Sequence, residues 1–230
     1  MLHSKKGFYF CLMDIFKSHR SYFILYFAFL VFAGYMLVVY SKSSIHLYFN
    51  QFYNSFSDVF FTYLTYIGSA IATIIIGLVY FLYSSKRKGL LIWMSVILAS
   101  LLTQFFKHVI FGPTPRPSIY FTEINPYQLH YVQGVKLLPY FSMPSGHATA
   151  AFALTFSIAL LYKNRKLDSA MFLLALLVGF SRIYLSQHFL EDVYLGSIIG
   201  VFATIIIYSW LYSPKYLEKT KLDTPMIKKK

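Results

Sequence analysis

A histidine and an aspartate lie four residues apart near the end of the sequence, at His188 and Asp192. On one helix this spacing brings both side chains to the same face, so the carboxylate can accept a hydrogen bond from the imidazole Nδ1–H. The other ring nitrogen, Nε2, then carries a lone pair and can act as a nucleophile or as a base. A His–Asp pair that only closes a helix start has the same spacing, so this pair alone leaves both interpretations open.

A second histidine follows a run that is typical of the beginning of a helix, Pro144-Ser145-Gly146-His147. Ser145 can cap the helix, and Gly146 lets a ligand approach the backbone. Free N–H groups at a helix N-terminus bind anions, so the run predicts an anion site beside His147. A merely capped helix would start in the same way, although a histidine in the first turn is a poor match to the helix dipole.

Three basic residues, Lys107, Arg116 and Arg182, stand beside polar residues at the ends of apolar segments. Charges next to a membrane span are costly, which favours a functional role, with snorkelling to the interface as the alternative for Lys107. Two histidines, one carboxylate and three cations around a helix N-terminus are what phosphoryl transfer without a metal requires. No carboxylate cluster offers itself for magnesium, and the single cysteine, Cys11, excludes a Cys-type zinc site. We expect neither a metal nor a cofactor.

The composition places these residues in a membrane protein. Of 230 residues, 57% are hydrophobic and only 13% are charged, which excludes an ordinary soluble domain, a disordered chain and a coiled coil. Runs of roughly 20 apolar residues cross a bilayer as helices. Six such runs lie at approximately 22–41, 58–83, 90–111, 146–162, 169–187 and 192–212. We therefore predict an all-α, six-span transmembrane helical bundle. Gly196 and Gly200 let the last helix pack closely against another helix of the chain, with packing against another subunit as the alternative.

The Lys and Arg residues predict the orientation of the bundle. The net charge of +13 would suggest nucleic-acid binding in a soluble protein. When the six runs alternate sides, however, sixteen of the 21 Lys and Arg residues fall on one side, which the positive-inside rule makes cytoplasmic. Both termini are then predicted to be cytoplasmic, and no nucleic-acid partner is expected. The outer side keeps Lys42, Lys107, Arg116, Lys136 and Arg182.

The same reasoning divides the chain into three parts. Residues 1–21 are predicted to be a cytoplasmic or interfacial lead-in, and 213–230 a basic cytoplasmic tail. The transmembrane domain, 22–212, carries a long outward loop at 112–145. Its aromatic portion, 118–143, is predicted to cover the site and to choose among headgroups, with a plain connection as the alternative. The sequence makes no prediction of the oligomeric state.

Together these blocks resemble the three-part signature of the type 2 phosphatidic acid phosphatase (PAP2) superfamily, which includes bacterial membrane lipid phosphatases and the vanadium haloperoxidases. Pro144-Ser145-Gly146-His147 matches the second block, and Ser181-Arg182 with His188 and Asp192 matches the third at the same spacing. In the first block, eight residues separate Lys107 from Arg116-Pro117, where the family has six. The extra pair predicts a bulge at Gly112-Pro113-Thr114-Pro115.

The resemblance implies a role for each matching residue. His188 attacks phosphorus and carries the phosphoryl group as phosphohistidine, while Asp192 orients His188. His147 protonates the leaving oxygen and then activates water. The residues implied to hold the phosphate are Lys107, Arg116, Ser145, Gly146 and Arg182. The resemblance implies a metal-independent lipid phosphatase. The compactness of the chain and its positive-inside bias fit a bacterial inner membrane, with the site facing the periplasm. Expected substrates are undecaprenyl diphosphate, lipid A phosphate or phosphatidylglycerol phosphate, presented from the bilayer.

Three other activities stay open at this point. A lipid phosphotransferase would use the same residues and pass the phosphoryl group to a second lipid instead of water. A non-enzymatic transporter would account for charges within spans but gives no reason for the histidine motifs. A vanadate-dependent oxidase on the same scaffold is disfavoured because the known members are soluble.

Overall fold

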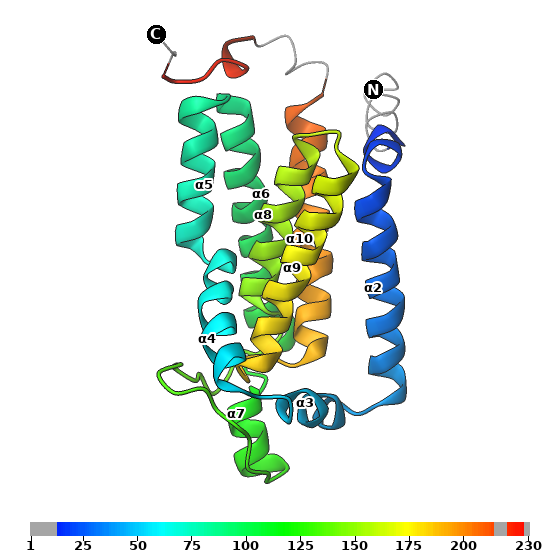
Figure 1. Ribbon diagram of the computed structural model, residues 1–230, viewed down its shortest axis with the longest axis vertical. Coiled ribbons are helices and arrows are strands. Elements are labelled where there is room, and N and C mark those ends of the chain that lie inside the picture. The colour runs from blue at the N-terminus through cyan, green and yellow to red at the C-terminus, as the bar shows by residue number, and fades with distance from the viewer. Residues whose placement is uncertain (1–12, 214–219, 228–230) are drawn as a thin grey trace.

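A computed structural model of the protein describes residues 13–213 and 220–227. In this part of the chain all regular structure is helical, as predicted, and long helices form a bundle that carries short helices and a loop at one end (Figure 1). Residues 1–12 of the predicted lead-in, and 214–219 and 228–230 of the predicted tail, lie outside the described residues. So do several basic residues used for the orientation: Lys5, Lys6, Lys215, Lys219 and Lys228 to Lys230.

Each predicted apolar run corresponds to a helix or to a pair of helices. Four runs correspond to single helices: α2 (Arg20–Val39), α8 (Gly146–Leu160), α9 (Arg165–Tyr184) and α10 (Leu190–Leu211). The third run is α6 (Lys86–Phe105), continued by the π-helical turn η2 (Phe106–Phe111). The second run is divided into α4 (Ser55–Leu64), the 3-10 turn η1 (Thr65–Gly68) and α5 (Ala70–Tyr83).

Fewer described helices can cross a membrane than there are predicted apolar runs. By length and composition, four described helices can cross a membrane: α2, α6 with η2, α9 and α10. A fifth span results if α4–η1 and α5 count as one, although they are bent by 57°. The bend lies at Ser69, whose side chain accepts a hydrogen bond from the Ala72 N–H and so begins α5 as a new helix. The six-span count stays a prediction.

Helix α8 explains why an apolar run need not be a lipid-facing span. It has 15 residues, fewer than the roughly 20 that cross a bilayer. Twelve of them are buried, which is typical of a helix that is apolar on all sides because other helices surround it. Helices α6, α9 and α10 pack around it. This central helix therefore fixes where its own N-terminus, and Ser145 with it, lies in the bundle.

The two glycines of α10 bring it close to α8. A Cβ atom on Gly196 would lie 2.9 Å from the carbonyl oxygen of Ser145, and one on Gly200 would lie 2.5 Å from that of Thr149. Only glycine permits backbones to approach so closely. The predicted packing of this pair within the chain is confirmed, and it aligns the N-termini of the two helices.

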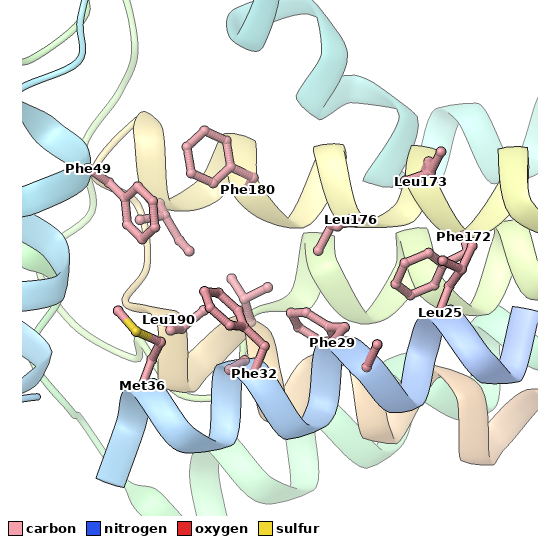
Figure 2. Close-up of a pocket in the computed structure, with 14 residues that line it drawn as sticks. Leu25, Phe29, Phe32, Met36, Phe49, Phe172, Leu173, Leu176, Phe180 and Leu190 are labelled. Carbon is pink, nitrogen blue, oxygen red and sulfur yellow. The ribbon is translucent and has the colours of Figure 1, made fainter. Parts of the chain in front are cut away.

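Helix α2 is the peripheral member of the bundle. An apolar cavity of about 370 Å³ lies between it and helices α9 and α10, lined only by apolar side chains (Figure 2). Phe29 and Phe32 of α2 face Phe172 and Leu176 of α9 across this space. Several other aromatic and aliphatic side chains of α2 are exposed, among them Ile24, Phe27 and Tyr35. Such a surface suits hydrocarbon rather than water.

Short elements gather at one end of the bundle, opposite the α5–α6 and α8–α9 junctions (Figure 1). They are α3 (Lys42–Asn50), α7 (Pro117–Ile119) and the π-helical turn η3 (Tyr120–Ile124), while η4 (Thr220–Leu222) lies near the other end. We predicted no helix between the first two runs, yet α3 forms there. Ser41 starts it by accepting from the Ser44 N–H, and its Ile45 and His46 side chains are buried.

Candidate active site

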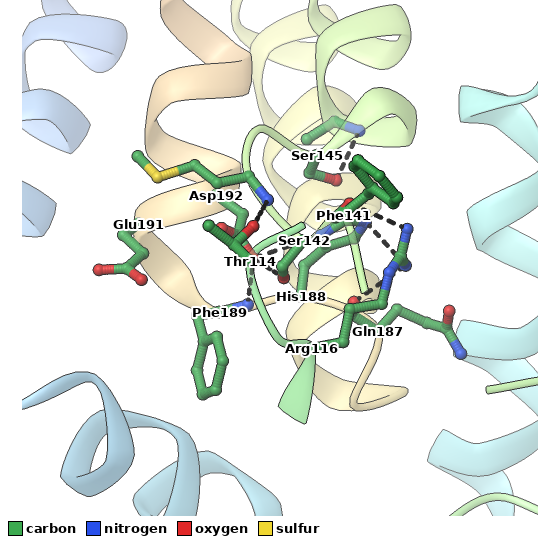
Figure 3. A network of polar contacts seen from close by, with 12 residues as sticks. Thr114, Arg116, Phe141, Ser142, Ser145, Gln187, His188, Phe189, Glu191 and Asp192 are labelled. Carbon is green, nitrogen blue, oxygen red and sulfur yellow. Dashed lines mark hydrogen bonds and ion pairs between the residues drawn. The ribbon is translucent and has the colours of Figure 1, made fainter. Parts of the chain in front are cut away.

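The predicted site residues converge at the end of the bundle that carries α3 and α7. The N-termini of α8 and α10 meet there, because the Ser145 N–H donates to the carbonyl oxygen of Asp192 at 3.0 Å. The C-terminal turn of α9 and the two ends of loop 112–145 complete the site (Figure 3). Lys107, Arg116, Arg182, His188 and Asp192 are all buried.

His188 and Asp192 make the predicted contact, although they do not share a helix. His188 precedes α10, for which Phe189 is the N-cap residue, and Asp192 stands in the first turn. The Oδ2 atom of Asp192 reaches back to the Phe189 N–H at 2.8 Å and lies 3.3 Å from the His188 Nδ1 atom. This is half of a capping box. The contact therefore comes from helix capping and not from two side chains on one helix face.

The neighbours of His188 determine its tautomer. Its Nε2 atom lies 3.3 Å from Nη1 of Arg116, and a guanidinium group can only donate. Nε2 must then be the acceptor, and Nδ1 carries the proton that points to Asp192. Burial lowers the pKa of His188 well below 6.5, and the positive charges of Arg116 and Arg182 lower it further. The ring is therefore neutral at pH 7, with a lone pair on Nε2.

Ser142 is a contact of Asp192 that the sequence did not reveal. Its hydroxyl donates to the same Oδ2 atom at 2.5 Å, so three donors hold one carboxylate oxygen (Figure 3). Ser142 lies in the loop portion 118–143 that was predicted to cover the site, fifty residues before Asp192 along the chain. Only the folding of the loop brings the two together, and one serine in a loop carries no signal of this.

Arg116 ties the loop to the turn that carries His188. Its guanidinium donates to the carbonyl oxygens of Tyr140 at 2.9 Å, of Gln187 at 3.1 Å and of Phe141 at 3.4 Å. Its backbone N–H donates to the Pro139 carbonyl at 2.9 Å. The two ends of the loop thus lie side by side, which is also seen where the Ser142 N–H donates to Thr114 at 3.1 Å.

Lys107 lies in the same cluster despite the longer spacing to Arg116. Its ammonium group donates to the Phe141 carbonyl at 2.5 Å and to the Ser142 carbonyl at 3.3 Å. Phe141 is also an acceptor for Arg116, so one loop carbonyl joins the two cations. The additional residues are accommodated in the π-helical turn η2 and at Gly112, whose φ of 67° lies in the left-handed region. The predicted bulge thus begins earlier than we expected, within the helix.

Arg182 approaches the site from the last turn of α9. Its Nη1 atom donates to the Thr65 hydroxyl at 2.6 Å, while its buried Nε atom has no partner in the described part of the chain. The same holds for the buried Oδ1 atom of Asp192. Unpaired buried polar atoms are rare, and two in one cluster indicate a site that a polar ligand completes.

The start of α8 supplies a different kind of group. Ser145 caps the helix, and its side chain accepts from the Ala148 N–H at 3.4 Å. The next two N–H groups, of Gly146 and His147, belong to the first turn, where a helix offers no internal acceptor. A Cβ atom on Gly146 would meet no heavy atom within 4 Å, so space lies open beside this backbone. Such a terminus can receive an anion.

The charges of this cluster suit an anionic ligand. Three cations face the single carboxylate of Asp192, and in residues 13–213 and 220–227 no group of three or more His, Cys, Asp or Glu side chains could hold a metal ion. The excess positive charge is buried beside a helix N-terminus. This arrangement can hold the oxygens of a phosphate group.

A further layer of contacts supports the turn before His188. From α3, the His46 ring accepts from or donates to the Ser186 hydroxyl at 3.1 Å, and Asn50 approaches the same hydroxyl at 3.5 Å. Ser186 has a φ of 50°, an unusual value for a residue other than glycine. Lys42 pairs with Glu191 at 3.3 Å, next to Asp192. Helix α3 thus holds the segment from 186 to 191.

Fold and site together define an all-helical protein with membrane-spanning segments and a cationic, histidine-bearing site at converging helix N-termini. The sequence profile of the PAP2 superfamily matches residues 88–215. This is more than half of the 230 residues, and the chain belongs to the PAP2 superfamily.

Two curated relatives match over a shorter region. Undecaprenyl-diphosphatase BcrC of Bacillus subtilis is 42% identical over 84 residues, which are 35% of this chain and 40% of the relative. A lipid A 4′-phosphatase of Bacteroides thetaiotaomicron is 31% identical over 86 residues, 37% of either chain. The matches thus span about two fifths of the length of these relatives.

Two solved structures are similar over most of the chain. LpxE of Aquifex aeolicus has a TM-score of 0.62 and 27% identity, covering 74% of this chain and 94% of its own. A transmembrane PAP2 type phosphatidylglycerolphosphate phosphatase from Bacillus subtilis has a TM-score of 0.56 and 22% identity, covering 83% and 95%, and shows the fold alone. With its apolar helices, the chain is an integral membrane protein of this fold.

Proposed function

We propose that the protein is a membrane lipid phosphatase that removes a terminal phosphate from a lipid phosphate or diphosphate. The observation that carries the proposal is the state of His188: a neutral ring whose Nδ1–H points to Asp192 and whose Nε2 lone pair lies among three cations. The names of the relatives support a phosphatase acting on undecaprenyl diphosphate or lipid A phosphate, and phosphatidylglycerol phosphate stays the third candidate substrate.

The proposed first step is attack by His188. The Nε2 lone pair forms a bond to phosphorus while the bond between phosphorus and the leaving oxygen breaks, and His147 gives that oxygen a proton. Arg116 has to turn from Nε2 to a phosphate oxygen when substrate binds. Asp192 stabilises the positive charge that develops on the His188 ring.

The second step releases the phosphate. His147, now neutral, takes a proton from water, whose oxygen attacks phosphorus as the bond from phosphorus to Nε2 breaks. Lys107, Arg116 and Arg182, with the cap at Ser145 and the Gly146 N–H, hold the equatorial oxygens through both steps. The scheme needs His188 neutral and His147 protonated once substrate is bound. The negative charge of the bound phosphate favours the protonated His147 ring, so kcat has a bell-shaped dependence on pH.

We further propose six spans with both termini in the cytoplasm and the site at the periplasmic face of a bacterial inner membrane. In this assignment the transmembrane domain is 22–212, with 1–21 and 213–230 on the cytoplasmic side. The described basic residues of the helix junctions support it: Lys86, Arg87, Lys88, Lys163, Arg165 and Lys166 lie at the end of the bundle opposite α3 and α7 (Figure 1). A lipid can then enter from the bilayer with its headgroup reaching His188.

Release of inorganic phosphate by the purified protein tests the activity. We expect release from at least one of undecaprenyl diphosphate, lipid A and phosphatidylglycerol phosphate, and a loss of at least a thousandfold in His188→Ala. His108→Ala, an exposed histidine, is the matched control. Ordinary turnover by His188→Ala would contradict the assignment. A phosphorylated second lipid among the products, in place of inorganic phosphate, would identify a phosphotransferase.

A further inference from the structure

A polar pocket of about 570 Å³ lies at the same end of the bundle, outside the cluster described above. It is formed by one face of α4 and by the loop segment that follows Leu129. The residues that line it are Ser55, Asp58, Val59, Thr62, Tyr63, His130, Tyr131, Val132 and Gln133. None of these residues has a part in the proposed phosphoryl transfer.

The face of α4 that forms the pocket also leads to the phosphate site. Asp58, Thr62 and Thr65 are spaced by four and three residues, so they lie on one face of the helix. Both ends of this row contact the last turn of α9: Asp58 accepts from the Tyr184 hydroxyl at 2.6 Å, and Thr65 accepts from Arg182 at 2.6 Å. Along the helix axis, seven residues correspond to about 10 Å. A group attached to a phosphate at Arg182 has to extend by about this distance along α4 to enter the pocket.

The pocket has a stable wall. The His130 ring lies 3.1 Å from an Asp58 oxygen and stacks on Tyr53 with a centroid distance of 3.9 Å and an interplanar angle of 7°. The Asn50 side chain bonds both the N–H and the carbonyl of His130, at 2.9 and 3.0 Å. These contacts from α3 and α4 fix the loop before any ligand binds, as a preformed subsite requires.

The chemistry of the lining selects the kind of ligand. It includes the Asp58 carboxylate with its partner His130, the Gln133 amide and several hydroxyl groups, but no lysine or arginine. The buried Thr62 hydroxyl has no hydrogen-bond partner in the described part of the chain. Such a surface offers acceptors to hydroxyl groups and repels an anion at Asp58.

We propose that this pocket is the headgroup subsite of the enzyme and that it takes a hydroxyl-rich, non-anionic group, as a sugar ring bearing the scissile phosphate would be. The proposal rests on the proposed function and names its substrate class: a phosphorylated glycolipid is preferred to a lipid diphosphate. The second phosphate of a diphosphate would meet the His130–Asp58 pair, with no lysine or arginine in the lining to hold it.

Thr62→Val tests the subsite, because the change keeps the shape of the side chain and removes only an unpartnered hydroxyl. We expect Thr62→Val and Gln133→Ala each to lower the ratio of kcat/KM for lipid A to kcat/KM for undecaprenyl diphosphate by about tenfold, mainly through KM. Ser95→Ala is the matched control, since it removes another buried, unpartnered hydroxyl, on α6. An unchanged ratio in both variants would overturn the proposal.

A binding measurement separates the subsite from the activity. In the His188→Ala background, which does not turn over, lipid A in detergent micelles should bind about tenfold more weakly when Thr62→Val is added. Equal binding with and without Thr62→Val overturns the subsite. If the wild-type protein releases phosphate from no lipid, while binding of lipid A still depends on Thr62, the subsite stands and the phosphatase assignment fails.

Discussion

At the scale of single residues, the site depends on how one carboxylate is held. Asp192 orients His188 only while its Oδ2 atom stays in place, and Ser142 makes the shortest of the three hydrogen bonds to that atom, at 2.5 Å. A hydrogen bond to a charged group contributes roughly 1.5–3 kcal/mol. Ser142 therefore acts on His188 through Asp192, as a positioning residue.

We expect Ser142→Ala to lower kcat between about tenfold and a hundredfold and to leave KM nearly unchanged, because the orientation of His188 is lost and the phosphate contacts remain. Steady-state kinetics measures this. Ser118→Ala removes a hydroxyl of the same loop that donates to the Leu138 carbonyl at 3.1 Å, away from Asp192, and serves as the control. A change confined to KM would argue against the positioning role.

The proposed catalytic residues of the site could be predicted from the sequence, whereas the residues that position them could not. His188 and Asp192 could be paired from their spacing, and Ser145 could be identified as a cap, because both contacts are local. Ser142 and Thr65 could not be identified, since each reaches its partner only after the loop or α4 folds onto the end of α9. The position of Lys107 could not be predicted either, because its distance along the chain from Arg116 departs from the family pattern. Only the π-helical turn η2 explains how Lys107 still reaches the loop that Arg116 contacts.

At the scale of elements, α3 supports the turn that presents His188. Its His46 is buried between the rings of Phe121 and Phe189 and lies 3.1 Å from the Ser186 hydroxyl. Burial lowers the pKa of His46 from 6.5 to about 4. The helix was missed in the sequence because its nine residues are short and only partly apolar, so they read as a connection between two longer runs.

The shifted pKa of His46 makes stability depend on pH. Above pH 6.5 the ring is neutral in both the folded and the unfolded chain. Between pH 6.5 and about pH 4 the unfolded chain binds the proton and the folded chain does not, so the free energy of unfolding falls as the pH is lowered through this range. The loss is on the order of 3 kcal/mol at most. Thermal unfolding in detergent between pH 7 and 4 should show a smaller fall in Tm for His46→Gln than for the wild type. Parallel curves would refute this role of His46.

The contact between α8 and α10 sets the distance between the two helix N-termini. Gly200→Ala places a Cβ atom 2.5 Å from a backbone oxygen of α8, which cannot move without shifting the helix. We expect a loss of about 1–3 kcal/mol in stability together with reduced kcat. Gly34→Ala is a control, because its Cβ would meet only the Tyr194 hydroxyl at 3.5 Å. Unfolding midpoints and rates for both variants give the comparison, and equal stability would contradict the close contact.

At the scale of the whole molecule, the bundle separates basic helix junctions at one end from the cationic site at the other (Figure 1). The segments were predictable because apolar runs of this length are strong signals. The number that cross the bilayer was not, because α8 is apolar through burial in protein and α4–α5 is bent at Ser69. Composition alone does not distinguish a buried helix from a lipid-facing one.

Cysteine labelling in intact cells tests the proposed orientation. In a Cys11→Ser background, a membrane-impermeant maleimide should label Gln133→Cys directly and Lys163→Cys only after the inner membrane is opened, because the positive-inside rule places the α8–α9 junction in the cytoplasm. The reverse pattern would invert the topology. Labelling of both positions in intact cells would mean that the two ends do not lie on opposite sides of the membrane.

In the proposed mechanism His188 is the nucleophile, and a rapid quench of the reaction can trap the phosphoryl group on it. With a lipid substrate labelled in its terminal phosphate, the protein should become labelled in a form that survives alkali and is lost in acid, as a phosphorus–nitrogen bond is. The label should be absent in His188→Ala and should map to His188 in the wild type. A wild-type protein that turns over without such a label, or a label that persists in His188→Ala, would contradict the mechanism.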